Sequence, residues 1–218
     1  MSDILTIIIP TRMRPNRLRR AIHSAVATVG MPTTVLVGWD HDLDGYNHCP
    51  DYPWLRKVDL PCRHYYVRAV NALYKYAKEN IDGFDYFVVC NDDDEFVFPN
   101  WGPAAIQALH KQFSDGMGLL ELFAPGTIGH WLSRSQFFEE TFHGRILEPC
   151  YTQYYADGEL LDHLRSIACY GSLLHEQQAV ISHSLYGTAD QLALQVRKAW
   201  LESDTEMYKE RKNAGLIP

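Results

Sequence analysis

Residues 4–10, Ile-Leu-Thr-Ile-Ile-Ile-Pro, decide the class of fold. This is a continuous, largely β-branched run that ends at a proline. Such a run is typical of a strand buried on both faces, as strands of a parallel sheet are. A helical pattern begins at Asn16 and repeats apolar residues along one side as far as Val26. The N-terminal part of the chain therefore predicts a strand followed by a helix.

The same alternation continues along the chain. Further strands are predicted at residues 35–39, 86–90 and 118–123, and helices at 69–77 and 101–113. This order predicts an α/β fold of Rossmann-like type, with a mostly parallel sheet flanked by helices. Residues 46–61 are interpreted as a loop. The last third is less regular, with possible strands at 128–133 and 179–181, helices at 135–142 and after Asp157, and a long amphipathic helix over 189–212.

Composition narrows the class of protein. The chain has 218 residues, 46% of them hydrophobic, which suits one globular domain with a small C-terminal appendage. A net charge of −7 argues against a protein that coats nucleic acid. The five cysteines have no CxxC spacing, so neither a zinc site nor a disulfide framework is expected. Because no apolar run is long enough for a signal peptide or a membrane span, a cytoplasmic protein is expected.

Polar clusters follow three of the predicted strands: Thr11-Arg12, Asp40 to Asp42, and Asp92 to Asp94. Ligands of open α/β sheets bind beyond the carboxyl ends of the strands, so these clusters are expected to converge. Three adjacent carboxylates repel each other, and a divalent cation such as Mg²⁺ or Mn²⁺ relieves that repulsion. The alternative is an acidic turn whose carboxylates all face water.

Other charged segments have two interpretations each. The D-x-D-x-D-G spacing from Asp40 to Gly45 is that of an EF-hand loop, but a strand precedes it, which favours a polar turn beside a ligand. The arginines between residues 12 and 20 form either a basic groove or a solvated helix face. Asp157 is placed as a helix N-cap or as a general base, with Glu159 as its competitor. His183 is a candidate ligand, with His130, His143, His163 and His175 as alternatives.

Several of these segments together resemble the family 2 glycosyltransferases of GT-A fold. The resemblance rests on residues 7–12 and the helix after them, the strand ending at Asp40, residues 68–71, residues 90–96 with Pro99 and Trp101, residues 156–160, and His183. The segment 90–96 is similar to the family's DxD motif. Segment 156–160 is similar to its acceptor-side acidic motif, except that Ala156 replaces the first acidic residue.

The resemblance implies a glycosyltransferase that moves a sugar from a nucleotide-sugar donor, with UDP-sugar favoured, to an acceptor hydroxyl with inversion. It implies a Mn²⁺ or Mg²⁺ ion held by Asp94, Asp92 and His183. It implies donor binding by Pro10, Thr11, Arg12, Asp40, Arg68, Asp92 and Asp93. It implies Asp157, or Glu159, as the base. The transferase domain is expected over residues 1–187, with residues 188–218 forming a helix packed on it.

Two other functions stay open. A nucleotidyltransferase also combines an α/β sheet with metal-binding aspartates, although residues 11–15 lack the glycine-rich loop typical of that class. A binder of nucleotide sugars without catalytic activity is the second alternative, because of Ala156. The acceptor is a saccharide or, as a minority interpretation, a modified base of viral DNA.

Overall fold

Seven strands form one sheet in the order β3-β2-β1-β4-β7-β6-β8 in the computed structural model, which describes residues 4–122, 129–173, 180–183 and 191–218. The strands are β1 (Leu5–Thr11), β2 (Thr33–Asp40), β3 (Leu55–Leu60), β4 (Tyr86–Val89), β6 (Leu119–Glu121), β7 (Trp131–Arg134) and β8 (Tyr170–Ser172). A separate pair consists of β5 (Asp94–Phe96) and β9 (Ile181–His183).

The described helices are α1 (Pro15–Thr28), α2 (Leu43–His48), α3 (Tyr65–Asn80), α4 (Trp101–Gln112), α5 (Ser135–Phe142), α6 (Ala156–Ser166) and α7 (Gln191–Asn213). Strands β3, β2, β1 and β4 are mutually parallel, and β7 runs antiparallel to both β4 and β6. The predicted α/β class, with a mostly parallel sheet flanked by helices, is therefore confirmed.

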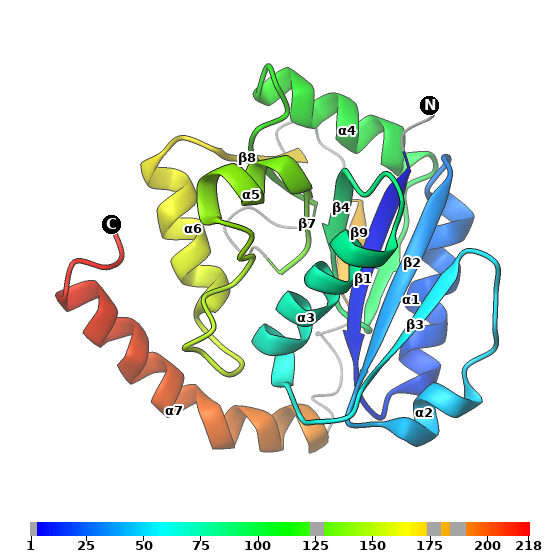
Figure 1. Cartoon of the computed structure of the whole chain (residues 1–218), viewed down its shortest axis with the longest axis horizontal. Helices are drawn as coiled ribbons and strands as arrows, with labels where there is room; N and C mark the ends of the chain where they lie inside the picture. The colour runs from blue at the N-terminus through cyan, green and yellow to red at the C-terminus, as the bar shows by residue number, and fades with distance from the viewer. Residues whose placement is uncertain (1–3, 123–128, 174–179, 184–190) are drawn as a thin grey trace.

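Alternate side chains of β1 enter two separate cores. Ile7 and Ile9 pack with residues of α1 and α4, whereas Ile8 packs with residues of α3, α5 and α6. All three are fully buried. In Figure 1, α3 lies in front of the central strands and α1 behind them. The continuous apolar run thus arises because helices cover both faces of the sheet.

Residues 46–61, interpreted as a loop, instead contain the end of α2 and the edge strand β3. The sequence of β3, LRKVDL, buries only its two leucines, so it lacks the apolar run of a central strand. The short strands β5 and β8 were also not predicted. Each has three residues and pairs with a segment distant in sequence, which leaves no local signal.

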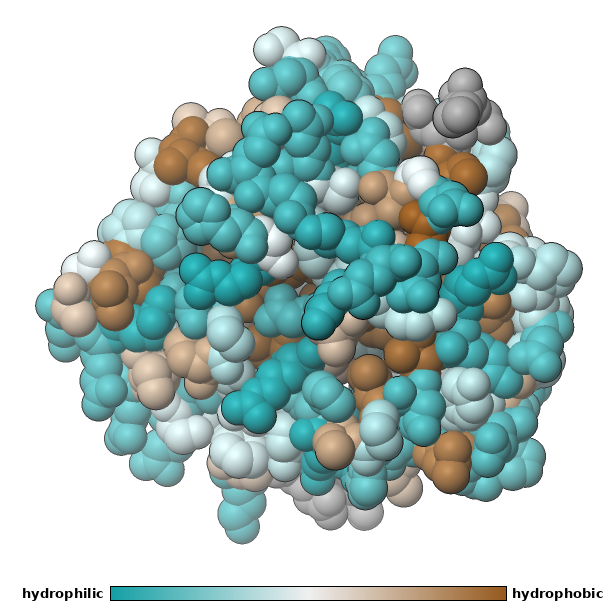
Figure 2. Space-filling model, in the orientation of Figure 1, coloured by the Kyte–Doolittle hydropathy of each residue, from teal (hydrophilic) through white to brown (hydrophobic). Residues whose placement is uncertain are grey.

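The C-terminal helix α7 crosses one side of the molecule and passes α6 (Figure 1). Figure 2 shows this view of the surface as mostly hydrophilic, with hydrophobic residues in small separate groups. Within the described residues, no helix has both the length and the apolar character needed to cross a bilayer.

Candidate functional site

A cavity of about 330 Å³ opens where β1, β2 and β4 end. That volume is at the lower end of the roughly 300–1,000 Å³ of small-molecule sites. The lining residues come from the ends of these strands, the start of α3, the segment before α6, and α7. They are Pro10, Thr11, Arg12, Arg14, Asp40, Arg63, Tyr65, Tyr66, Ala69, Asn91, Asp92, Asp93, Gln153, Tyr154 and Val196.

Asp92 joins the segment after β4 to the end of β1. Its carboxylate accepts hydrogen bonds from Thr11 Oγ1 at 2.7 Å and from Arg14 Nη1 at 3.0 Å. Burial raises its pKa to about 6, although Arg14 and Thr11 both favour the ionised form. The side chain is thus a buried carboxylate whose charge is only partly compensated, which is the condition that a bound cation relieves.

Asp93 faces the same arginine-rich segment. Its Oδ2 atom lies 3.4 Å from Arg17 Nη1 and 3.9 Å from Arg14 Nη1. The sequence left two interpretations of the arginines between residues 12 and 20, a basic groove or a solvated helix face, and the structure contains both. Arg12, Arg14 and Arg17 lie at or beside the cavity, whereas Arg19 and Arg20 are exposed on α1.

Arg12 brings positive charge to the cavity wall, and no acidic side chain of the described residues forms an ion pair with it. Among the described residues, its buried Nε and Nη1 atoms have no hydrogen-bond partner. Unpaired buried donors of a guanidinium are costly, so such donors are suited to an anionic ligand. Arg63 adds a second cationic group, which lies 4.2 Å from the ring centre of Tyr65.

Asp40 lines the cavity but also holds the beginning of α3. Its Oδ1 atom accepts from the backbone N–H of His64 at 2.5 Å, and its Oδ2 atom accepts from that of Tyr65 at 3.0 Å. Tyr65 has a φ of +57°, a left-handed conformation that is uncommon for an aromatic residue. The same left-handed conformation occurs at Met13 and His41, which follow Arg12 and Asp40 in the chain. Strained backbone of this kind gathers at functional sites.

Asp42, the next acidic residue, caps α2. Its Oδ1 atom accepts from Gly45 N at 3.1 Å, and its Oδ2 atom accepts from Met13 N at 2.7 Å. The D-x-D-x-D-G segment is therefore a helix start and not an EF-hand loop.

Asp94 does not line the cavity. It is 1% exposed, accepts from Asn91 N at 2.7 Å, and lies 2.7 Å from His130 Nδ1. The backbone of Asp94 pairs with that of His183 in the β5–β9 ladder. The side chain of His183 and the whole of His175 lie outside the described residues. Within the described part of the chain, no group of three or more His, Cys, Asp or Glu side chains is arranged to hold a metal.

Asp157 occupies the first turn of α6, where its Oδ1 atom accepts from Gly158 N at 2.9 Å. It is not the N-cap that its sequence position suggested, because Tyr155 holds that place with a φ of +65°. Burial raises the pKa of Asp157, although its hydrogen bonds to backbone N–H groups and the nearby His130 lower it. The pKa of the cavity residue Tyr66 is raised by its own burial first and then by the charges of Asp157 and Asp94. The Asp157 carboxylate therefore lies near the cavity without forming its wall.

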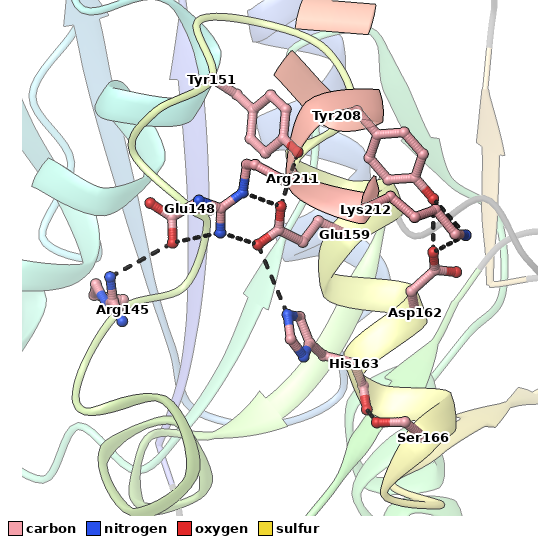
Figure 3. Close-up of polar contacts among 10 residues, drawn as sticks. All are labelled: Arg145, Glu148, Tyr151, Glu159, Asp162, His163, Ser166, Tyr208, Arg211 and Lys212. Carbon is pink, nitrogen blue, oxygen red and sulfur yellow. Dashed lines mark hydrogen bonds and ion pairs between the residues drawn. The ribbon is translucent and has the colours of Figure 1, made fainter. Parts of the chain in front are cut away.

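Glu159 and Arg68 lie outside the cavity lining. Glu159 is 3% exposed and accepts from Arg211 Nε at 2.8 Å, from Arg211 Nη2 at 2.6 Å and from Tyr151 Oη at 2.8 Å (Figure 3). Arg68 is exposed on α3. Among the alternative histidines, His143 is exposed and His163 lies 3.7 Å from Glu159. These placements give Glu159 an evident structural partner and leave Asp157 nearer the cavity.

Six cavity residues carried no clear signal in the sequence: Arg63, Tyr65, Tyr66, Gln153, Tyr154 and Val196. They lie just before or at the start of α3, before α6 and in α7, where no motif distinguishes them. Only the adjacent aromatic pair Tyr65-Tyr66, a few residues before the helix predicted at 69–77, could have indicated a binding surface.

No family model matches the chain, and no curated protein does. Solved structures share its fold. S. aureus TarS 1–349 in complex with UDP aligns with a TM-score of 0.59 and 12% identity over 81% of this chain and 59% of that one. The mannosyltransferase PcManGT from Pyrobaculum calidifontis, in complex with GDP-Man and Mn²⁺, aligns with a TM-score of 0.53 and 13% identity over 77% of this chain and 53% of that one. The chain thus has a GT-A-like fold, and it spans little more than half of these structures.

Proposed function

We propose that this chain is a glycosyltransferase that moves a sugar from a nucleoside diphosphate sugar to an acceptor hydroxyl. The observation that carries the proposal is the cavity at the carboxyl ends of β1, β2 and β4, which Arg12 lines together with Asp92 and Asp93. The buried Nε and Nη1 atoms of Arg12 have no hydrogen-bond partner among the described residues. A GT-A-like fold around this cavity supports the proposal, because two structures of that fold contain UDP or GDP-Man. UDP-sugar is the favoured donor.

The donor would lie with its diphosphate toward Arg12 and its nucleoside between the end of β2 and the start of α3. Pro10, Thr11 and Asp40 form part of this wall, and Tyr65 and Tyr66 supply aromatic faces. Arg68 is exposed and remains a candidate only for the outer edge of the site. In this view residues 1–187 form the transferase domain, and residues 188–218, which include α7, complete the cavity through Val196.

The charges of the cavity fit a divalent cation. Its described lining contains three arginines, Arg12, Arg14 and Arg63, and three aspartates, Asp40, Asp92 and Asp93, so it is formally neutral. A diphosphate would add negative charge. Cations such as Mg²⁺ are often held by one or two carboxylates plus substrate phosphates, so a cluster of three protein ligands is not required.

Asp92 and Asp93 would hold Mn²⁺ or Mg²⁺ together with the donor, and the cation would neutralise the diphosphate as it leaves. Asp94 and His183 are a second candidate pair, since their backbones are paired beside this segment. Asp157 would accept the proton of the acceptor hydroxyl as that oxygen attacks the anomeric carbon, and a single displacement inverts the configuration. A saccharide is the favoured acceptor, and a modified DNA base is the alternative.

A donor panel tests the proposal. The protein is incubated with UDP-, GDP-, and other nucleotide sugars in Mn²⁺, and free nucleoside diphosphate is measured with and without saccharide acceptors. We expect release from one donor class, loss of release in EDTA, and its return with Mn²⁺ or Mg²⁺. Binding of a nucleotide sugar without any turnover would favour the non-catalytic binder. Pyrophosphate release from a nucleoside triphosphate would favour a nucleotidyltransferase.

A further inference from the structure

Asp204 is a buried carboxylate in the middle of α7 whose partners are all backbone groups near the cavity. It is 3% exposed. Its Oδ1 atom accepts from Thr152 N at 3.1 Å, and its Oδ2 atom accepts from Gln153 N and Tyr154 N, each at 2.8 Å. A side chain that binds three successive amides fixes the path of that segment, much as a capping residue fixes the start of a helix.

The segment that Asp204 holds is part of the cavity wall. Gln153 and Tyr154 line the cavity, and Gln153 Oε1 accepts from Tyr66 N at 3.1 Å on the opposite side. Residues 152–154 are thus held between α7 and the start of α3. A second contact between these helices lies nearby, where Tyr65 and Trp200 meet edge to face with ring centres 5.1 Å apart.

The same segment leads directly to Asp157. Tyr155 turns the chain into α6 with a φ of +65°, and its ring packs against Tyr208 of α7 at 5.2 Å. A left-handed conformation at a tyrosine persists only where the surroundings impose it. Because Asp204 holds the three residues immediately before this turn, it determines where α6 begins and, with it, where Asp157 lies.

We propose that Asp204 is a positioning residue of the donor site. It holds residues 152–154, of which Gln153 and Tyr154 line the cavity, and it fixes the start of α6, whose first turn contains Asp157. This inference rests on the proposed transferase function. It assigns α7 a part in the site that goes beyond covering the domain.

Two variants of Asp204 and one control separate positioning from general stability. Asp204→Ala removes all three hydrogen bonds. Asp204→Asn can keep the two bonds at Oδ2 through its carbonyl oxygen. The control is Asp162→Asn. Asp162 also joins the body to α7, since it accepts from Tyr208 Oη at 2.6 Å and Lys212 Nζ at 3.2 Å, but it lies outside the cavity lining.

For each variant, calorimetry gives the Kd for UDP or GDP with Mn²⁺, kinetics give kcat and KM for the donor, and hydrogen exchange follows the amides of residues 152–154. We expect Asp204→Ala to raise the Kd about tenfold, the effect of leaving buried donors unpaired. We also expect a higher donor KM, a lower kcat and faster exchange at 152–154. Asp204→Asn should recover part of each effect, and Asp162→Asn should match the wild type.

Two results would overturn the inference, and they are distinguishable. If the wild type binds and turns over donor while Asp204→Ala behaves as Asp162→Asn does, the positioning role is wrong and the proposed function stands. If the wild type binds no nucleoside diphosphate at all, the proposed function fails and the inference fails with it.

Discussion

Asp157 is the residue on which the proposed chemistry most directly depends. Because its Oδ1 atom accepts from Gly158 N, asparagine can keep that hydrogen bond while it removes the basic group. We expect Asp157→Asn to fold with an unchanged melting temperature and to bind donor as the wild type does. Its kcat should fall by roughly 10²–10⁴-fold, the range for loss of a general base. Steady-state kinetics with the accepted donor measure this.

Glu159→Gln is the matched comparison on the same helix turn. Glutamine offers one acceptor oxygen to Arg211, where Glu159 offers two. We therefore expect a loss of stability of about 1–3 kcal/mol, because a buried charged partner loses part of its hydrogen bonding. The kcat of the folded protein should be retained. An inactive Glu159→Gln beside an active Asp157→Asn would reverse the two roles.

The pH dependence of turnover follows from the burial of Asp157. Burial raises the pKa of this carboxyl above its usual range, about 3.9 for a free aspartate. The base form is the ionised one, so the active fraction increases as the pH rises through the raised pKa. We expect kcat to rise with pH along a limb that lies above the ordinary aspartate range. A profile of kcat against pH that stays flat between pH 4 and 8 would remove Asp157 from the reaction.

At the scale of elements, the start of α3 depends on a carboxylate from β2. Asp40→Ala removes the acceptors of His64 N and Tyr65 N. We expect a loss of about 1–2 kcal/mol in unfolding free energy, as for a helix cap, and weaker nucleoside diphosphate binding because Tyr65 and Arg63 form the wall beside it. Denaturant titration and calorimetry measure the two effects.

Asp42→Ala is the control for Asp40, since Asp42 caps α2 in the same manner but does not line the cavity. It should lose similar stability and keep its nucleotide affinity. If Asp40→Ala keeps its affinity as well, Asp40 is a structural cap alone.

The central strands of the sheet could be predicted from the sequence, whereas the edge strand β3 could not. Residues 4–10 and 86–90 were predictable as central strands because burial on both faces requires continuous apolar residues. Their shared parallel direction then places Thr11 and Asp92 together, and the structure joins them at 2.7 Å. The edge strand β3 was not predicted, because its sequence LRKVDL has neither a continuous apolar run nor a regular alternation of apolar and polar residues.

The direction in which each side chain of a motif points cannot be predicted from the sequence alone. Three adjacent aspartates predict one site, yet the turn after β4 sends Asp92 and Asp93 to the cavity and Asp94 to His130. Asp204 presents the same difficulty. A single acid in an amphipathic helix is interpreted as part of the solvated face, and only the tertiary structure shows that it is buried against three amides.

At the scale of the whole molecule, charge is expected to govern binding of the proposed donor. The chain carries a net charge of −7, so a nucleoside diphosphate approaches a protein of its own sign. The described lining of the cavity has three arginines and three aspartates, so its formal charge is zero and it does not by itself attract an anion. Arg14 is already bound to Asp92, so Arg12 and Arg63 are the groups most available to an anion.

Donor and cation should therefore bind with mutual reinforcement. Asp92 and Asp93 alone are expected to hold Mn²⁺ weakly, because no group of three suitable ligands occurs among the described residues. Bound diphosphate adds ligand oxygens and negative charge, which strengthens cation binding, and linkage requires that the cation strengthen diphosphate binding by the same factor. Titrating UDP or GDP with and without Mn²⁺, and Mn²⁺ with and without nucleotide, should give equal factors of about 10 or more, within the usual range of coupling energies.

Thermal shift gives an independent measure of the same linkage. A ligand that binds only the native state stabilises it by about 2.7 kcal/mol at one hundred times its Kd. We expect Mn²⁺ with the nucleotide to raise the melting temperature by more than the sum of the two separate shifts. Asp93→Asn should reduce that excess, because it removes one carboxylate from the cavity and keeps its shape. If EDTA leaves nucleotide affinity unchanged, the arginines alone neutralise the diphosphate, and the cation has no part in donor binding.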